Sequence, residues 1–209
     1  MSRDDATLGD ISVAPILLAG GAGSRFRDVG HKLTAGLPER AGRPRESVVS
    51  RSLAAALDAD IGVPVIVTGR LDADALGIGD RTDVTAVHND DWQQGQMTSV
   101  QRGLDAARYA NADIVVVGLA DQPGIDPSAW RAVADAVLGG ARIAVATYDG
   151  RRANPVGLHR DVWDLLAETG DEGARGLMRL RPHLVIEVPC TGSPNDIDTV
   201  EDLTRWQSN

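Results

Sequence analysis

Residues 13–26 read VAPILLAGGAGSRF, an apolar run that stops at three glycines within four positions. The run Val13–Leu18 is apolar throughout, which is typical of a strand buried on both faces of a sheet. Glycines after a strand let the backbone take positive φ and approach a ligand closely, and the exposed N–H groups of such a loop bind phosphate. Arg25 and Lys32 follow, in positions from which they can contact phosphate oxygens. The same glycines also suit a tight turn into a helix, and this alternative stays open.

Short apolar runs alternate with segments of helical periodicity along the rest of the chain. Strands are predicted at 13–18, 63–68, 84–87, 114–118, 143–147 and 184–188. Helices are predicted at 47–57, 97–107, 127–138, 161–167, 173–180 and 200–207. Apolar strands that alternate with helices imply crossover connections and parallel pairing. The sequence therefore predicts an α/β fold in three layers, with a mostly parallel sheet and helices on both of its faces.

Length and composition indicate one domain. The 209 residues, 43% of them hydrophobic, suit a single domain over 11–209 that follows a polar, flexible N-terminal tail at 1–10. The first ten residues lack the apolar stretch of a signal peptide, and no apolar run approaches the ~20 residues of a membrane span. Cys190 is the only cysteine, which suits a reducing compartment. The net charge of −9 argues against nucleic-acid binding. We expect a cytoplasmic protein that binds neither membranes nor nucleic acids.

Basic residues are unevenly distributed between the two types. Lys32 is the only lysine among 21 basic residues. Codon bias alone can remove lysine from a chain, so its presence here is suggestive only. It lies in the segment 27–45, which contains Gly, Pro and Arg without any periodicity. A stretch of this length inside a compact domain is usually functional or mobile.

Aspartates lie in two places, at the end of a predicted strand and in the segment before the last predicted helix. Ligands of open parallel sheets bind near the carboxyl ends of the strands. Asp121 directly follows the apolar strand IVVVGLA. A buried acid needs a cation or hydrogen bonds, and Mg²⁺ prefers one or two carboxylates together with phosphates and waters; a helix N-cap is the alternative. In the run NDIDT, Asp196 and Asp198 alternate and so face one way on an extended segment. Thr199 with Asp202 reads as the capping box of the last helix.

At LAGGAGSRF followed by a lysine, the sequence resembles the signature loop of MobA-like nucleotidyltransferases, and it is most similar to the molybdenum-cofactor cytidylyltransferase branch. The resemblance covers roughly Ile11–Trp206. The other matching stretches are NDDWQQGQMTSVQRG (89–103), GLADQP (118–123), NPVG (154–157), GDEGAR (170–175) and DIDTVEDL (196–203). Two departures stand out. Lys32 lies seven places after Arg25 where the family usually has five, and LAGG is commoner in guanylyltransferases than in cytidylyltransferases, so the base stays open.

The resemblance implies a Rossmann-like nucleotidyltransferase fold and a reaction. A nucleoside monophosphate is transferred from an NTP to molybdopterin, with release of pyrophosphate and with Mg²⁺, or alternatively Mn²⁺, as cofactor. Four of the five downstream stretches favour CTP; GTP is the alternative, as is a sugar or another phosphate as acceptor. A molybdenum hydroxylase would then receive the cofactor. An alternative from another class is a non-catalytic molybdopterin-binding module, for which Lys32 and Asp121 would be dispensable. The glycine spacing disfavours an NAD-binding domain.

The resemblance also assigns site residues. Catalytic roles fall to Arg25, Lys32 and Asp121, and Asp121 and Asp198 become the metal ligands. The segments 154–157 and 170–175 are expected to face the second substrate. With the strand-end candidate Thr68, the expected nucleotide contacts are Leu18, Ala19, Gly20, Gly21, Gly23, Ser24, Arg25, Lys32, Thr68, Gly95, Ser99 and Ala120. For Ser99, an ordinary helix cap is the alternative.

Overall fold

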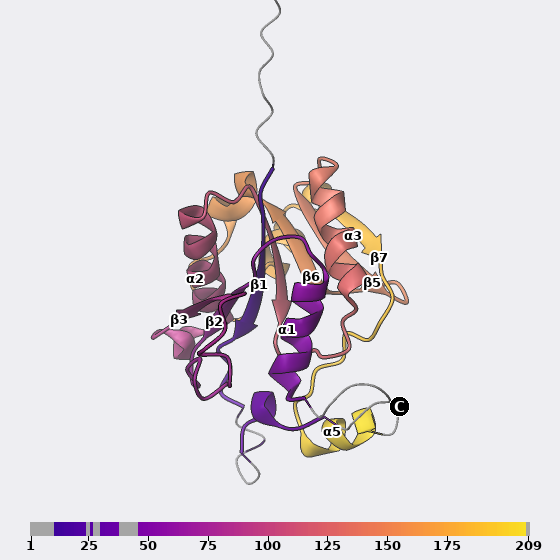
Figure 1. Ribbon diagram of the computed structural model, residues 1–209. Helices are drawn as coiled ribbons and strands as arrows, with labels where there is room; N and C mark the ends of the chain where they lie inside the picture. The colour runs from indigo at the N-terminus through magenta and orange to yellow at the C-terminus, as the bar shows by residue number, and fades with distance from the viewer. Residues whose placement is uncertain (1–10, 24–25, 27–29, 38–45, 208–209) are drawn as a thin grey trace, which may run out of the picture.

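The computed structural model describes residues 11–23, 26, 30–37 and 46–207 (Figure 1). The predicted tail at 1–10 lies outside these residues, as do Ser24, Arg25 and most of the segment 27–45. No helix within the described ranges is long and apolar enough to cross a membrane.

A seven-stranded sheet, in the order β3-β2-β1-β4-β6-β5-β7, forms the centre of the described chain. All pairings are parallel except the two made by β6. The mostly parallel sheet expected from the sequence is therefore confirmed. The strands are β1 (Val13–Ala19), β2 (Val65–Thr68), β3 (Thr85–His88), β4 (Ile114–Leu119), β5 (Ile143–Tyr148), β6 (Arg151–His159) and β7 (Val185–Pro189).

Helices cover both faces of the sheet, which gives the three expected layers. The α-helices are α1 (Val48–Asp58), α2 (Gln96–Tyr109), α3 (Pro127–Leu138), α4 (Arg175–Leu180) and α5 (Val200–Gln207). Short 3₁₀ helices are η2 (Lys32–Thr34), η3 (Trp92–Gln94), η4 (Arg160–Leu165) and η5 (Pro182–Leu184). The helix predicted at 161–167 corresponds to η4. Figure 1 shows α1 and α3 in front of the sheet.

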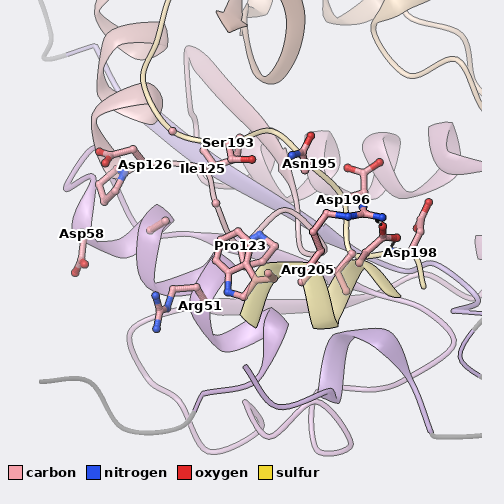
Figure 2. A pocket seen from close by; sticks show the side chains of 17 residues that line it. Arg51, Asp58, Pro123, Ile125, Asp126, Ser193, Asn195, Asp196, Asp198 and Arg205 are labelled. Carbon is pink, nitrogen blue, oxygen red and sulfur yellow. Dashed lines mark hydrogen bonds and ion pairs between the residues drawn. The ribbon is translucent and has the colours of Figure 1, made fainter. Parts of the chain in front are cut away.

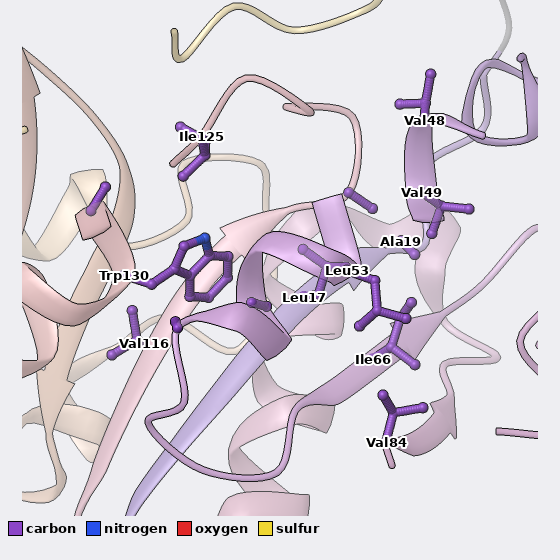
Figure 3. Close-up of a cluster of buried hydrophobic side chains, with 14 of the residues drawn as sticks. Leu17, Ala19, Val48, Val49, Leu53, Ile66, Val84, Val116, Ile125 and Trp130 are labelled. Carbon is purple, nitrogen blue, oxygen red and sulfur yellow. The ribbon is translucent and has the colours of Figure 1, made fainter. Parts of the chain in front are cut away.

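Alternate residues of β1 pack into two separate apolar cores. Leu17 and Ala19 pack with α1 and α3, in a cluster that contains Trp130 (Figure 3). Ile16 and Leu18 point to the other face and pack with α2, α4 and η4. The strand is apolar throughout because each of its faces meets a helical layer.

The sequence prediction missed β6, although it is an internal strand. It pairs antiparallel with both β4 and β5. The stretch RRANPVGLH reads poorly as a strand because proline has no N–H to donate to a ladder. The structure accommodates Pro155 at a register shift, since Val145 pairs with Val156 but Ala146 pairs with Ala153. Asn154 and Pro155 thus fall outside the regular ladder.

Candidate functional site

The glycine loop, Gly20–Gly23, follows β1 at the carboxyl edge of the sheet and runs close to neighbouring segments. A Cβ added to Gly20 would lie 2.9 Å from Ser99 Oγ, and one added to Gly69 would lie 2.7 Å from the Cα of Gly20. Gly23 has a φ of +57° and its carbonyl accepts a hydrogen bond from the Phe26 N–H (3.0 Å). The loop therefore uses glycine both for close backbone approach and for a left-handed turn.

Lys32 joins two carboxylates that are far apart in the sequence. Its Nζ lies 2.6 Å from Asp121 Oδ2 and 2.6 Å from Asp198 Oδ1. Lys32 begins η2, Asp121 follows β4, and Asp198 precedes α5. Burial opposes the charge on the ammonium, but the charge of Asp121 and the hydrogen bonds to both carboxylates outweigh it and raise the pKa of Lys32. We call these three residues the Lys32–Asp121–Asp198 cluster.

His31 fixes the backbone just before Lys32. Its Nδ1 accepts a hydrogen bond from the Leu33 N–H (3.3 Å), so the neutral ring carries its proton on Nε2, which donates to the Gly21 carbonyl (3.2 Å). Burial, together with the nearby charges of Lys32 and Arg70, lowers the pKa of His31 although the hydrogen bond to Gly21 works the other way. The neutral ring thereby ties η2 to the glycine loop.

Asp198 is fixed by its neighbour Ile197. The Ile197 side chain is 2% exposed in the core, and its N–H donates to the Asp121 carbonyl (2.9 Å). This bond brings the segment before α5 against the end of β4. Thr199 and Asp202 form the capping box expected from the sequence, with Asp202 N–H donating to Thr199 Oγ1 (3.1 Å) and Thr199 N–H donating to Asp202 Oδ2 (3.0 Å).

The cluster offers oxygen donors that suit a divalent cation. Asp121 Oδ1 is buried and, among the described residues, has no hydrogen-bond partner. A buried acceptor without a hydrogen bond is costly. The carboxylate of Asp198 contacts the same Lys32 ammonium as the carboxylate of Asp121 does. Within the described ranges there is no group of three or more His, Cys, Asp or Glu side chains that could hold a metal. Two carboxylates are enough for Mg²⁺ when substrate phosphates and waters complete its shell, so the residues fit that ion.

A pocket of about 310 Å³ opens beside the glycine loop, and we call it the glycine-loop pocket. The glycine loop, Lys32 and Asp121 form one part of its wall, and η3, the start of α2 and Asp171 form another part. Its lining residues are Leu18, Ala19, Gly20, Gly21, Ala22, Lys32, Leu33, Trp92, Gln93, Gly95, Gln96, Ser99, Leu119, Asp121 and Asp171.

Most of the described residues expected to contact the nucleotide line this pocket, but Thr68 and Ala120 do not. Thr68 is 2% exposed, and its hydroxyl is hydrogen-bonded to His88 Nδ1 (3.0 Å) within the sheet. Both backbone polar groups of Ala120 are used internally, since its N–H donates to the Leu18 carbonyl (3.0 Å) and its carbonyl accepts from Ser52 Oγ (2.9 Å). Gly23 shapes the turn instead of lining the pocket. Ser24 and Arg25 lie outside the described residues.

The sequence reasoning did not single out Asn89, which organises one wall of the pocket. Asn89 is 1% exposed. Its Nδ2 donates to Thr98 Oγ1 and to Ser99 Oγ (both 2.9 Å), and its Oδ1 accepts from the Asp91 N–H (3.0 Å). Asn89 is the first residue of the matching stretch 89–103, which was the only signal for it. Trp92 is half-buried and lines the pocket.

The segment 170–175, expected near the second substrate, lies against the start of α2. The Met97 N–H donates to the Gly170 carbonyl (2.8 Å), and the Gln96 N–H donates to Asp171 Oδ1 (3.0 Å). Asn154 and Arg175 line a narrow cavity of about 40 Å³, which shares Gln96 with the glycine-loop pocket. The structure therefore places Asp171 at the glycine-loop pocket.

A second and larger pocket, about 910 Å³, lies between α1 and α5 on the other side of the cluster, and we call it the α1–α5 pocket (Figure 2). Among the described residues that line it, the carboxylates are Asp58, Asp126, Asp196, Asp198 and Asp202, and the cations are Arg51 and Arg205. Trp206 forms part of the wall. Because Asp198 lines this pocket while Lys32 and Asp121 line the other, the ion pairs stand where the two pockets meet.

A buried glutamine connects the α1–α5 pocket to β6. Gln122 is 5% exposed. Its Nε2 donates to Asp196 Oδ1 (2.7 Å), and its Oε1 accepts from Asn154 Nδ2 (3.1 Å). The position of Asp196 therefore depends on the residue pair that interrupts the β5–β6 ladder.

Comparisons with known proteins agree with this architecture. A family model described as the MobA-like NTP transferase domain matches residues 15–186. The purine catabolism protein PucB of Bacillus subtilis (strain 168) is 32% identical over 116 residues, which cover 54% of this chain and 56% of PucB. The match thus spans little more than half the length of that relative.

Solved structures match over almost the whole chain. Rv0371c from Mycobacterium tuberculosis H37Rv is 25% identical, with a TM-score of 0.80 over 95% of this chain and 98% of that chain. The structure of its complex with manganese is 23% identical, with a TM-score of 0.75 over 95% of this chain and 99% of that chain. A nucleotidyl transferase from Methanothermobacter is 22% identical, with a TM-score of 0.76 over 94% of this chain and 96% of that chain.

Proposed function

Because this chain belongs to the MobA-like NTP transferase family, we propose that it transfers a nucleoside monophosphate, from CTP in preference to GTP, to the terminal phosphate of molybdopterin. The observation that carries the proposal is the Lys32–Asp121–Asp198 cluster, in which Lys32 Nζ lies 2.6 Å from both carboxylates at one end of the glycine-loop pocket. A phosphate-binding loop, a cation and two acids at one site are the groups that nucleotidyl transfer requires.

In the proposed reaction, an oxygen of the acceptor phosphate attacks the α-phosphorus of the NTP. The new P–O bond forms as the bond to the β-phosphate oxygen breaks, and pyrophosphate leaves. The glycine loop holds the triphosphate through its backbone N–H groups. Lys32 neutralises charge that develops on the phosphate oxygens, and Arg25 is proposed to assist it. A Mg²⁺ or Mn²⁺ ion held by Asp121 and Asp198 would supply further neutralisation of the phosphate charge when bound.

The α1–α5 pocket supports a pterin as the acceptor. Its volume of about 910 Å³ falls in the range of small-molecule sites. Carboxylates are acceptors only, so its acidic wall suits a ring rich in N–H donors, and Trp206 offers an aromatic surface for stacking. The acceptor phosphate would then point towards Asp198 and the glycine-loop pocket. A molybdenum hydroxylase, as the protein that takes the product, is the corresponding partner.

The test is incubation of the protein with each NTP in turn, together with molybdopterin and Mg²⁺. We expect pyrophosphate release with CTP and a product whose mass equals molybdopterin plus a cytidine monophosphate unit. Release with GTP alone would move the assignment to guanylyl transfer. Release with a sugar phosphate but not with molybdopterin would replace the acceptor. Tight molybdopterin binding without any pyrophosphate, unchanged in Lys32→Ala and Asp121→Asn, would instead identify a non-catalytic binding module.

A further inference from the structure

The charged side chains of the glycine-loop pocket come from different parts of its wall. Among the described residues that line it, the charged side chains are Lys32, Asp121 and Asp171. Asp121 is paired with Lys32 beside the glycine loop, where the triphosphate is proposed to bind. Asp171 lines the pocket with η3 and α2, and it has no basic partner among the described residues. Asp171 is exposed, so a ligand in the pocket can reach its carboxylate.

The carboxylate of Asp171 is held in one orientation by backbone contacts. Its Oδ1 accepts from the Gln96 N–H (3.0 Å), and the preceding Gly170 carbonyl accepts from the Met97 N–H (2.8 Å). Gly95 packs so closely on this segment that an added Cβ would lie 2.7 Å from the Gly170 carbonyl carbon. Gly170 itself has a φ of +105°. Within the described part of the chain, the second oxygen, Oδ2, has no hydrogen-bond partner and is available to a ligand.

We propose that Asp171 selects the base of the nucleotide by accepting a hydrogen bond from its exocyclic amino group. The inference rests on the proposed function, because it assumes that the base lies against η3 and the start of α2. The amino group is on C4 in cytosine and on C2 in guanine. In UTP a carbonyl oxygen replaces the cytosine amino group, and a carboxylate would then face a second acceptor. In ITP the guanine amino group is missing, and Oδ2 would stay unbonded.

Both mismatches leave polar groups unpaired, and this is what makes a hydrogen-bonding site selective. A hydrogen bond to a charged group contributes about 1.5–3 kcal/mol, which corresponds to about 10- to 100-fold in affinity. We therefore expect CTP to bind at least about tenfold more tightly than UTP, or GTP than ITP if the protein uses guanine.

The substitution Asp171→Asn changes the group that faces the base but keeps the hydrogen bond to the start of α2. Asparagine caps helix N-termini about as well as aspartate does, so the bond to the Gln96 N–H is retained through the amide oxygen. The amide nitrogen of the new side chain is a donor, so it suits the carbonyl oxygen of UTP. Glu168→Gln is the matched control, because it removes one negative charge from an exposed residue three positions away in the same segment.

The experiment is calorimetric titration of the wild-type protein and both variants with CTP, UTP, GTP and ITP in the presence of Mg²⁺. We expect the CTP/UTP or GTP/ITP affinity ratio to fall at least about fivefold in Asp171→Asn, since one charged hydrogen bond is exchanged, and to stay unchanged in Glu168→Gln. An unchanged ratio in Asp171→Asn, or an equal loss of affinity for all four nucleotides, would overturn the inference and leave the proposed function standing. No binding of any nucleotide to the wild-type protein would overturn both.

Discussion

Lys32 occupies the position between Asp121 and Asp198 that a divalent cation takes in the proposed reaction. In the structure its ammonium compensates both acids, and in the reaction it is needed by the phosphates. We expect Lys32→Ala to slow pyrophosphate release about 10²-fold or more, the scale of losing one transition-state donor. Steady-state release of pyrophosphate with saturating NTP and acceptor is the measurement. An unchanged rate would remove Lys32 from the chemistry.

The same position predicts an opposite effect on metal binding. Lys32→Met keeps the apolar stem but removes the ammonium, so the Lys32 charge no longer offsets the negative charge of Asp121 and Asp198. We expect Mn²⁺, measured by calorimetry without nucleotide, to bind Lys32→Met more tightly than the wild type. Since the variant loses both part-buried ion pairs of Lys32, it should also be less stable than the wild type, and Mn²⁺ should restore part of that loss. Lys32→Arg, which retains the charge, is the control. Equal Mn²⁺ affinity in all three proteins would refute the idea.

His31 predicts a specific dependence of stability on pH. Burial, with the charges of Lys32 and Arg70, lowers the pKa of His31 in the folded protein. In the unfolded chain a histidine side chain has a pKa near 6.5. Between these two values the unfolded state binds more protons, so the contribution of His31 is complete above pH 6.5 and is lost as the pH falls through the lower, folded pKa. A second proton on Nδ1 would also break its bond to Leu33.

The measurement is urea unfolding at pH 7.5, 6.5 and 5.5. We expect the free energy of unfolding to fall less with decreasing pH in His31→Asn than in the wild type, because asparagine can still accept from Leu33 without titrating. His183→Asn, which replaces an exposed histidine, controls for the loss of a histidine elsewhere. Parallel pH profiles for the wild type and His31→Asn would contradict the assignment.

At the scale of the elements, β6 depends on one residue without a side chain. A Cβ on Gly157 would lie 2.8 Å from Val137 Cγ2 and 2.9 Å from Val133 Cγ1 of α3. We expect Gly157→Ala to destabilise the protein by about 1–3 kcal/mol, the usual range for overpacking a core, measured as a shift in the urea midpoint. In Gly21→Ala no atom of the described residues lies within 4 Å of the new Cβ, so this variant should leave the midpoint unchanged. If the two variants unfold alike, α3 does not pack on β6 as described.

The elements differ in how far the sequence could predict them. The apolar strands were recoverable because burial on both faces leaves a continuous pattern, as in IVVVGLA. β6 was not, because its ladder is interrupted at Pro155 and its packing relies on a glycine, and neither feature has a periodic signal. The same reason applies to Asn89 and Asp171. Their roles come from contacts with residues of α2, which local pattern cannot reveal, whereas Lys32 and Asp121 follow recognisable motifs.

At the scale of the molecule, the candidate site draws on segments spread over most of the sequence. Lys32 is 89 residues from Asp121 and 166 residues from Asp198. What the sequence could not supply is their geometry, which depends on the sheet order that sets β1 beside β4. That order places the ends of both strands at one edge, and the Ile197 bond adds the third segment.

This joint dependence predicts how ligand binding stabilises the whole protein. With CTP and Mg²⁺ at about 100 times the dissociation constant, we expect about 2.7 kcal/mol of added stability in the wild type, read as a higher melting temperature. Asp121→Asn should lose most of that gain, together with Mg²⁺-dependent CTP binding in calorimetry, while its circular dichroism stays native. Asp164→Asn, at a side chain that is 91% exposed, should keep the full gain. Normal nucleotide affinity in Asp121→Asn would refute the metal assignment.

The ion pairs that stand between the two pockets also make those pockets thermodynamically dependent on each other. A ligand that draws the Lys32 ammonium towards the glycine loop releases Asp198 to the α1–α5 side, and a ligand that engages Asp198 releases the ammonium in return. By linkage, each occupant then changes the affinity for the other by an identical factor. The two substrates would bind cooperatively through the three side chains of the Lys32–Asp121–Asp198 cluster, without any movement of the sheet.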